Sequence, residues 1–155
     1  MYQYKVKSIN DVVDGDTLDV TIDLGFDISY SSRVRMNGID TPESRTTDLE
    51  EKKMGLYAKT WLKHVLISAR DIVIETEKPD STEKYGRILG TLYINGDKIS
   101  VNDKMIELGI AWKYDGGTKH KDLDALRIIQ ANHAQEIFPT INNIPLNPTI
   151  IPIKK

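Results

Sequence analysis

Residues 33–43, Arg-Val-Arg-Met-Asn-Gly-Ile-Asp-Thr-Pro-Glu, constrain the fold more than any other stretch of the chain. Val34 and Met36 alternate with two arginines, and this period of two predicts a strand with one apolar and one basic face. Asp40 has the same parity as the two apolar residues. A carboxylate on the apolar side of a strand is costly unless a cation or several donors lie beside it. The strand is therefore expected to end in a polar site.

The residues after Asp40 allow two interpretations. Pro42 ends the strand, because it lacks an N–H group and biases Thr41 toward an extended conformation. A threonine N-cap, a proline in the first helical position and Glu43 in the first turn are a common way to begin a helix. The same groups also make an oxygen-rich metal site beside an arginine.

Alternating apolar residues predict further strands on both sides of this segment. The first strand carries Tyr2, Tyr4 and Val6, and a clearer one carries Leu18, Val20, Ile22 and Leu24. Gly25 is expected to turn the chain into a partner strand with Phe26, Ile28 and Tyr30. Asp16 shares the parity of the apolar face that begins at Leu18, so it is a second inward carboxylate that needs a partner.

Three helices are expected, over residues 49–67, 101–108 and 123–137, from apolar spacing and capping residues. With five or so short strands, the fold class is α+β: a small closed antiparallel barrel capped by helices. The domain is expected to cover residues 1–138. Residues 139–155 form a Pro- and Ile-rich arm, which we expect to lie against this domain or to mediate self-association with a neighbouring copy.

Composition limits the classes of function. A net charge of −2 argues against tight, sequence-independent nucleic-acid binding, although not against a nuclease that turns over. The absence of cysteine excludes disulfides and thiol catalysis. No apolar run is long enough to span a membrane, and the first nine residues do not resemble a secretory signal. A cytoplasmic location is expected, or secretion if a leader had been removed.

Asp16 and Asp40 come from separate strands and can meet at one hard divalent cation, with Thr41 and water completing its ligands. Oxygen ligands without histidine suit Ca²⁺ or Mg²⁺ better than Zn²⁺. His64, His120 and His133 show no spacing typical of ligands and are interpreted as ordinary helix or loop residues.

Arg35 and Arg87 are expected at the same rim, where two guanidinium groups match phosphate oxygens. A cation, two arginines and a free carboxylate describe a phosphodiester hydrolase, with Glu43 taking the proton of the attacking water. Tyr85 offers a contact to a phosphate or a base, and Tyr114 offers a face for stacking. Packing in the core or in a hairpin is the alternative role of these aromatic side chains.

Three motifs in one consistent order, DGDT at 14–17, RxxGIDTPE at 35–43 and KYGR at 84–87, resemble the staphylococcal nuclease family. The resemblance implies an OB-fold barrel with three helices and Ca²⁺-dependent cleavage of single-stranded DNA and RNA to 3′-phosphate products. It implies metal ligands from Asp16, Asp40 and the Thr41 carbonyl, and phosphate stabilisation by Arg35 and Arg87. It also implies that Glu43 is the general base or a carboxylate that orients the attacking water. It further suggests Lys84 and Tyr85 at a terminal phosphate and Tyr114 near a base.

The chain departs from the family pattern at Glu83, where Asp is frequent, in the segment 44–53, and in the final arm. The main alternative function is a non-catalytic OB-fold module that binds single-stranded nucleic acid or a protein. A third possibility is a phosphodiesterase for small nucleotides. Presence of every expected catalytic residue favours the enzyme.

Overall fold

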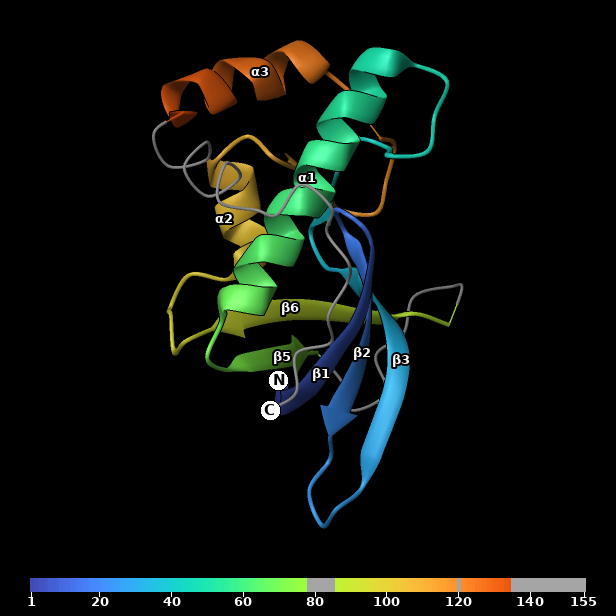
Figure 1. Ribbon diagram of the computed structural model, residues 1–155, viewed down its shortest axis with the longest axis vertical. Coiled ribbons are helices and arrows are strands. Elements are labelled where there is room, and N and C mark those ends of the chain that lie inside the picture. The colour runs from blue at the N-terminus through green and yellow to red at the C-terminus, as the bar shows by residue number, and fades with distance from the viewer. Residues whose placement is uncertain (78–85, 120, 135–155) are drawn as a thin grey trace.

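The computed structural model describes residues 1–77, 86–119 and 121–134, in which five strands close into a barrel (Figure 1). The order around the barrel is β1, β2, β3, β6, β5, and β5 pairs with β1 to complete it. All neighbouring pairs are antiparallel except β3 and β6, which run parallel. The strands are β1 (Tyr2–Asp14), β2 (Thr17–Asp23), β3 (Ser29–Met36), β5 (Ile72–Thr76) and β6 (Ile88–Ile94).

Three helices lie outside the barrel: α1 (Leu49–Ser68), α2 (Val101–Glu107) and α3 (Leu123–Asn132). A short sheet of β4 (Ile39–Asp40) and β7 (Trp112–Lys113) links the segment after β3 to the segment after α2. The expected α+β class, a five-stranded barrel with three helices, is confirmed. The predicted boundary at residue 138 and the arm 139–155 lie outside the described residues. No helix in the described ranges has both the length and the apolar composition of a membrane span.

The long strand β1 bends around the barrel because its pairing with β2 is irregular. The register shifts between Val6 and Ser8, again before Asp11, and again after Val12. Each shift exchanges the faces of the strand, so the buried residues are Val6, Ile9 and Val12 at a spacing of three. This departure from simple alternation lets one strand pair with β2 along most of its length and with β5 near its start.

The parallel pairing of β3 with β6 brings the backbones and side chains of three strands close together. Gly90 of β6 lies opposite Met36 of β3. A Cβ at Gly90 would stand 2.7 Å from the Ile74 side chain and 3.1 Å from the Val34 side chain. Glycine at this position therefore allows β3, β5 and β6 to lie close to one another. Arg35 lies in the part of β3 that pairs with β6.

Helix α1 does not begin at Thr41, as the interpretation of residues 41–43 as a helix start would require. Its N-cap is Asp48, whose carboxylate accepts hydrogen bonds from the backbone N–H groups of Glu50 and Glu51. Thr41 and Glu43 therefore precede the helix in a separate segment. The face of α1 that packs on the barrel buries Ala58, Trp61, Leu62 and Leu66.

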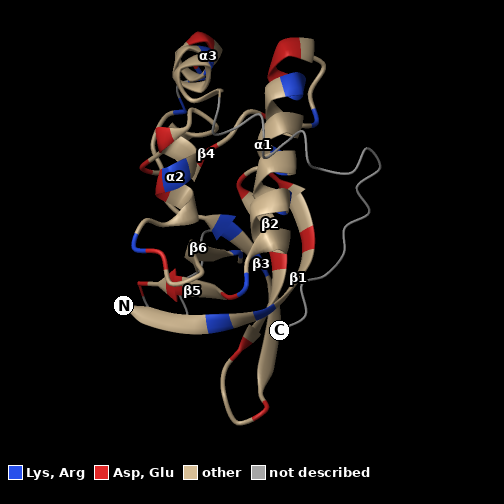
Figure 2. Ribbon diagram, turned by 60° about the vertical axis from the view of Figure 1, so that its left-hand side comes forward, with Lys and Arg blue, Asp and Glu red and all other residues tan. Residues whose placement is uncertain are grey.

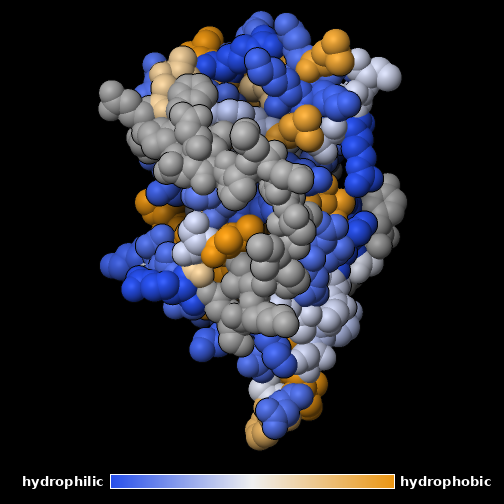
Figure 3. Space-filling view, viewed as in Figure 1, coloured by the Kyte–Doolittle hydropathy of each residue, from blue (hydrophilic) through white to orange (hydrophobic). Residues whose placement is uncertain are grey.

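The hairpin between β2 and β3 extends beyond the barrel and differs from the expected strand pairing. Phe26 and Asp27 have φ of 54° and 61°, so they form the turn instead of the start of a strand. Phe26 is 98% exposed, and Leu24 and Ile28 are also exposed. Figure 3 shows apolar side chains at this tip, at the bottom of the view. The inward face of β2 therefore ends at Ile22.

Candidate active site

The turn between β1 and β2 brings Asp16 against the segment that follows β4. Gly15 makes this approach possible, because a Cβ there would lie 2.9 Å from Thr41 Oγ1 and 2.8 Å from Ala58 Cβ. Asp16 is buried, and its Oδ2 accepts a hydrogen bond of 3.2 Å from the Thr41 backbone N–H. Its Oδ1 accepts a second bond of 2.9 Å from the Thr17 hydroxyl. Gly15 thus allows the close approach of the two segments, and Asp16 makes the hydrogen bonds that join them.

Arg35 joins the two inward aspartates. Its Nη1 lies 3.4 Å from Asp16 Oδ2, and its Nη2 lies 3.5 Å from Asp40 Oδ1. All three side chains are almost buried, with 10%, 11% and 4% of their surface exposed for Arg35, Asp16 and Asp40. The structure therefore brings together the two carboxylates that parity alone had placed on the apolar side of their strands.

Thr41 lies between these aspartates and is buried. Its hydroxyl oxygen has no hydrogen-bond partner among the described residues. A buried hydroxyl without a partner costs roughly 1–3 kcal/mol, so such a group needs an explanation such as an ion or a water molecule. Within the described ranges, no cluster of three or more His, Asp or Glu side chains has the geometry of a metal site. Of the described residues, a cation bound here would have only two carboxylates and Thr41 as ligands, together with water.

Glu43 lies just outside this pair, with 43% of its side chain exposed. Burial raises the pKa of Glu43 most, and the negative charge of Asp14 raises it further, while the Lys121 ammonium opposes the shift. Lys121 Nζ lies 3.8 Å from Glu43 Oε1 and 3.0 Å from Glu51 Oε1. A carboxylate whose pKa is raised toward the working pH is a better proton acceptor than an ordinary one.

A cleft of about 520 Å³ opens beside Asp40, lined by Arg35, Arg87, Tyr114 and Lys119 among others. Arg87 also borders a neighbouring hollow that contains Asp14 and Thr17, so it stands between the cleft and the β1–β2 turn. Lys and Arg are interspersed with Asp and Glu along the ribbon (Figure 2). An anion in this cleft would meet the cationic side chains of Arg35, Arg87 and Lys119.

Tyr114 is held in the cleft by two hydrogen bonds. Its backbone N–H donates to the Gly38 carbonyl at 2.8 Å, and its hydroxyl donates to the Gly117 carbonyl at 2.9 Å. Lys84 and Tyr85, the other two expected substrate contacts, lie outside the described residues. The structure thus brings six of the expected residues into one region, namely Asp16, Arg35, Asp40, Thr41, Arg87 and Tyr114, with Glu43 at its edge.

Two lysines of the segment before α3 enter this region without having been expected there. Lys119 Nζ lies 3.2 Å from Asp40 Oδ1, and Lys121 contacts Glu51 and Glu43. Their contacts cross more than 65 residues of sequence. The available signal was a pair of lysines flanking His120 after a double glycine, which alone does not indicate a partner.

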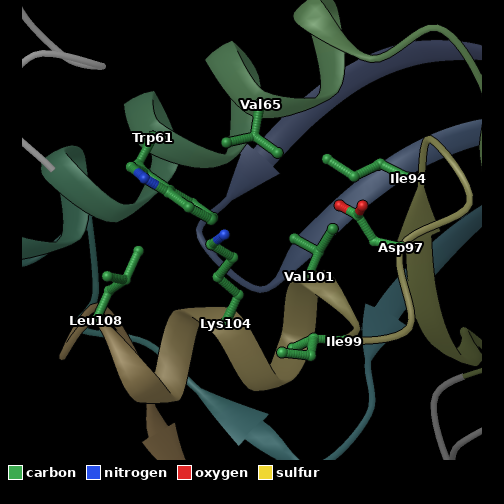
Figure 4. A pocket seen from close by; sticks show the side chains of 8 residues that line it. All are labelled: Trp61, Val65, Ile94, Asp97, Ile99, Val101, Lys104 and Leu108. Atoms are coloured by element: carbon green, nitrogen blue, oxygen red, sulfur yellow. The ribbon is translucent and has the colours of Figure 1, made fainter. Parts of the chain in front are cut away.

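A separate hollow of about 350 Å³ lies between α1, α2 and the end of β6 (Figure 4). Its walls are mostly apolar, with Trp61, Val65 and Val101 from the two helices. Lys104 and Asp97 are the charged residues that line it. None of the predicted site residues lines this hollow, whereas Arg35, Arg87 and Tyr114 line the cleft beside Asp40.

The chain is similar to known proteins over most of its length. Residues 33–136 match the family described as staphylococcal nuclease homologue. Protein ParB of Escherichia coli is 31% identical over 133 residues, which cover 81% of this chain and 67% of that protein. The SPbeta prophage-derived endonuclease YokF of Bacillus subtilis (strain 168) is 31% identical over 118 residues, 74% of this chain and 37% of YokF. An uncharacterized endonuclease of Escherichia coli is 31% identical over 104 residues, 67% of this chain and 58% of that protein.

Proposed function

Because the chain belongs to the family of staphylococcal nuclease homologues, we propose that it is a nuclease that uses a divalent cation to hydrolyse phosphodiester bonds. The family match confirms the resemblance expected from the three motifs. Two of the relatives are named as endonucleases, which supports cleavage within a chain. Single-stranded DNA and RNA are the proposed substrates, with products that carry a 3′-phosphate.

The observation that supports this proposal best is the Arg35 guanidinium between two buried aspartates. Asp16, in the turn between β1 and β2, and Asp40, in β4, approach the same guanidinium group. The Thr41 hydroxyl, next to Asp40 in sequence, is buried with no hydrogen-bond partner among the described residues. Hard oxygen donors of this kind fit Ca²⁺, and also Mg²⁺, which keeps several of its waters when bound. We propose Asp16, Asp40 and the Thr41 carbonyl as the residues that hold the cation.

The proposed reaction is attack of a water oxygen on phosphorus with cleavage of the P–O5′ bond. Asp16, Asp40 and Thr41 would hold a divalent cation, which would supply polarisation of the phosphate for attack. Glu43 accepts the proton of the water, for which its raised pKa is suited. Arg35 and Arg87 donate hydrogen bonds to phosphate oxygens as their negative charge increases. The 5′-oxygen leaves and takes up a proton from solvent, so the other product retains its phosphate at the 3′ position.

Recognition of the substrate is proposed to use the cleft beside Asp40. The face of Tyr114 is suited to stacking on an unpaired base, and such stacking is worth roughly 1–3 kcal/mol per base. Lys84 and Tyr85 are proposed to bind a terminal phosphate, in line with the KYGR motif. A non-catalytic binding module and a phosphodiesterase for small nucleotides are the alternatives that an assay must separate.

The deciding experiment is cleavage of a fluorescent single-stranded oligonucleotide with Ca²⁺, with Mg²⁺ and with EDTA. We expect cleavage with a divalent cation, none with EDTA, and a loss of about 10²–10⁴-fold in turnover for Glu43→Gln. Glu107→Gln, on the exposed side of α2, is the matched control and should retain full turnover. Retained binding without cleavage under all conditions supports the module, and cleavage of dinucleotides alone supports the phosphodiesterase.

A further inference from the structure

Asp40 is paired with two cations in this structure. Arg35 Nη2 lies 3.5 Å and Lys119 Nζ lies 3.2 Å from the same oxygen, Oδ1 of Asp40. Only 4% of the Asp40 side chain is exposed, so both pairs are poorly screened by solvent. Lys119 reaches this position from the segment before α3, and its ammonium also lies 5.5 Å from the centroid of the Tyr114 ring.

The two cations differ in how easily they can leave. Arg35 is almost buried in β3, and its Nη1 also donates to the Met36 carbonyl at 3.1 Å. Lys119 is 42% exposed and follows the glycines Gly116 and Gly117. Lysine is a flexible point charge that holds a carboxylate without the fixed geometry of a guanidinium fork. Displacement of Lys119 from Asp40 therefore disturbs the fold less than displacement of Arg35.

The local charge explains why one cation has to leave. Two carboxylates, Asp16 and Asp40, are balanced by two cations, Arg35 and Lys119. A divalent ion adds two positive charges to the same carboxylates, and like charges at such distances repel strongly when buried. The ammonium and the ion also require the same Asp40 oxygen.

We propose that Lys119 is an exchangeable counter-ion of Asp40 that competes with the divalent cation for this carboxylate. This inference rests on the metal site of the proposed function and adds a regulation of that site. Without the cation, Lys119 holds Asp40 in its ionised, inward position. When the cation binds, the ammonium leaves Asp40 and stays in the cleft beside Tyr114. There its positive charge faces the substrate phosphate that Arg35 and Arg87 are proposed to bind.

The test is the affinity for Ca²⁺ in the absence of nucleic acid, measured by isothermal titration calorimetry on the full chain. Lys119→Gln is compared with wild type and with Lys121→Gln, which removes the same charge from an ammonium that contacts Glu51 and Glu43 instead of Asp40. We expect Lys119→Gln to tighten Ca²⁺ binding about tenfold, which corresponds to about 1.4 kcal/mol. Lys121→Gln should change it by less than threefold.

A second readout is thermal unfolding. In EDTA, Lys119→Gln should unfold at a lower temperature than wild type, because Asp40 has lost one of its cations, and saturating Ca²⁺ should reverse this order. Circular dichroism establishes that the variant is folded at the temperature of the titration.

The outcomes separate this inference from the proposed function. Equal Ca²⁺ affinity in wild type, Lys119→Gln and Lys121→Gln overturns the competition and leaves the nuclease intact. If Lys119→Gln binds Ca²⁺ more tightly and the wild type cleaves no nucleic acid, the counter-ion role of Lys119 is supported and the nuclease is refuted. Absence of Ca²⁺ binding in both wild type and Lys119→Gln overturns the counter-ion proposal, and the cleavage assay with Ca²⁺, Mg²⁺ and EDTA then decides the nuclease separately.

Discussion

The backbone of Glu43 lies directly on Gly55, in the second turn of α1. A Cβ at Gly55 would stand 2.4 Å from both the carbonyl carbon and the carbonyl oxygen of Glu43, and 2.6 Å from the backbone nitrogen of Ser44. These are backbone atoms, so they cannot move aside as a side chain can. Glycine inside a helix costs about 1 kcal/mol relative to alanine. Here it allows a rigid helix to set the position of the proposed general base.

Replacement of Gly55 by alanine should therefore separate activity from helix stability. Helix propensity favours Gly55→Ala, whereas the added methyl group pushes residues 43 and 44 away from α1. Turnover on a single-stranded oligonucleotide is expected to fall by about 10²-fold, because small displacements of catalytic groups have effects of that order. Leu56→Ala, at the neighbouring exposed position, is the control. Full turnover in Gly55→Ala would show that the contact does not position Glu43.

The two arginines should differ in their effect on stability. Arg35→Gln and Arg87→Gln are both expected to reduce turnover by about 10²–10³-fold, as for lost donors to a developing oxyanion. Arg35→Gln should also destabilise the protein in EDTA, by up to about 3 kcal/mol, because two buried aspartates lose their shared cation. Arg87 lines two open hollows, so a smaller loss is expected for Arg87→Gln. Urea unfolding measures the difference, and equal losses would contradict the bridging role of Arg35.

Alkaline pH should weaken the fold through Tyr57. Burial raises the pKa of the Tyr57 hydroxyl to about 12 from its ordinary value of 10. The folded state therefore favours the protonated form, and its contribution to stability is complete below pH 10 and is lost as the pH rises toward 12. Tyr57→Phe cannot ionise, so its unfolding free energy should decline less steeply than that of wild type above pH 10. Urea titrations at pH 9, 10 and 11 test this, and parallel declines would refute it.

The arm at residues 139–155 remains a prediction from its composition, which combines isoleucines with prolines. If it covers apolar surface of this domain or of a second copy, deletion of residues 142–155 should lower the unfolding temperature or change the oligomeric state. Differential scanning fluorimetry and sedimentation velocity report these two properties. A truncated protein that matches wild type in both would mean that the arm has no structural partner.

The polar positions of the site could be predicted because parity in a strand is a local property. Asp16 and Asp40 were expected to face inward from two-residue periodicity alone, and both are buried beside Arg35. Lys119 could not be predicted in the same way, because its contact with Asp40 depends on where α2 and β7 lead the chain. No local pattern encodes that path.

The strands were predicted less completely than the inward carboxylates. A prediction from simple alternation cannot detect the register shifts in β1, which move the buried residues to Val6, Ile9 and Val12. It also assigned Phe26 to a strand, whereas the residue lies in the turn with positive φ. Irregular pairing and unusual turns depend on neighbouring strands, so periodicity within one segment does not reveal them.

The parallel pairing of β3 with β6 determines when the candidate site is assembled during synthesis of the chain. Asp16, Asp40 and Glu43 all precede residue 44, but Arg87 arrives only with the strand that closes the barrel. Pairings between segments so distant in sequence form late, because the entropy cost of closing a long loop comes before the stabilising contacts are made. A nascent chain that has not yet reached residue 87 therefore carries the acidic half of the site without its second arginine. The cleft beside Asp40 is therefore complete only after β6 has paired with β3.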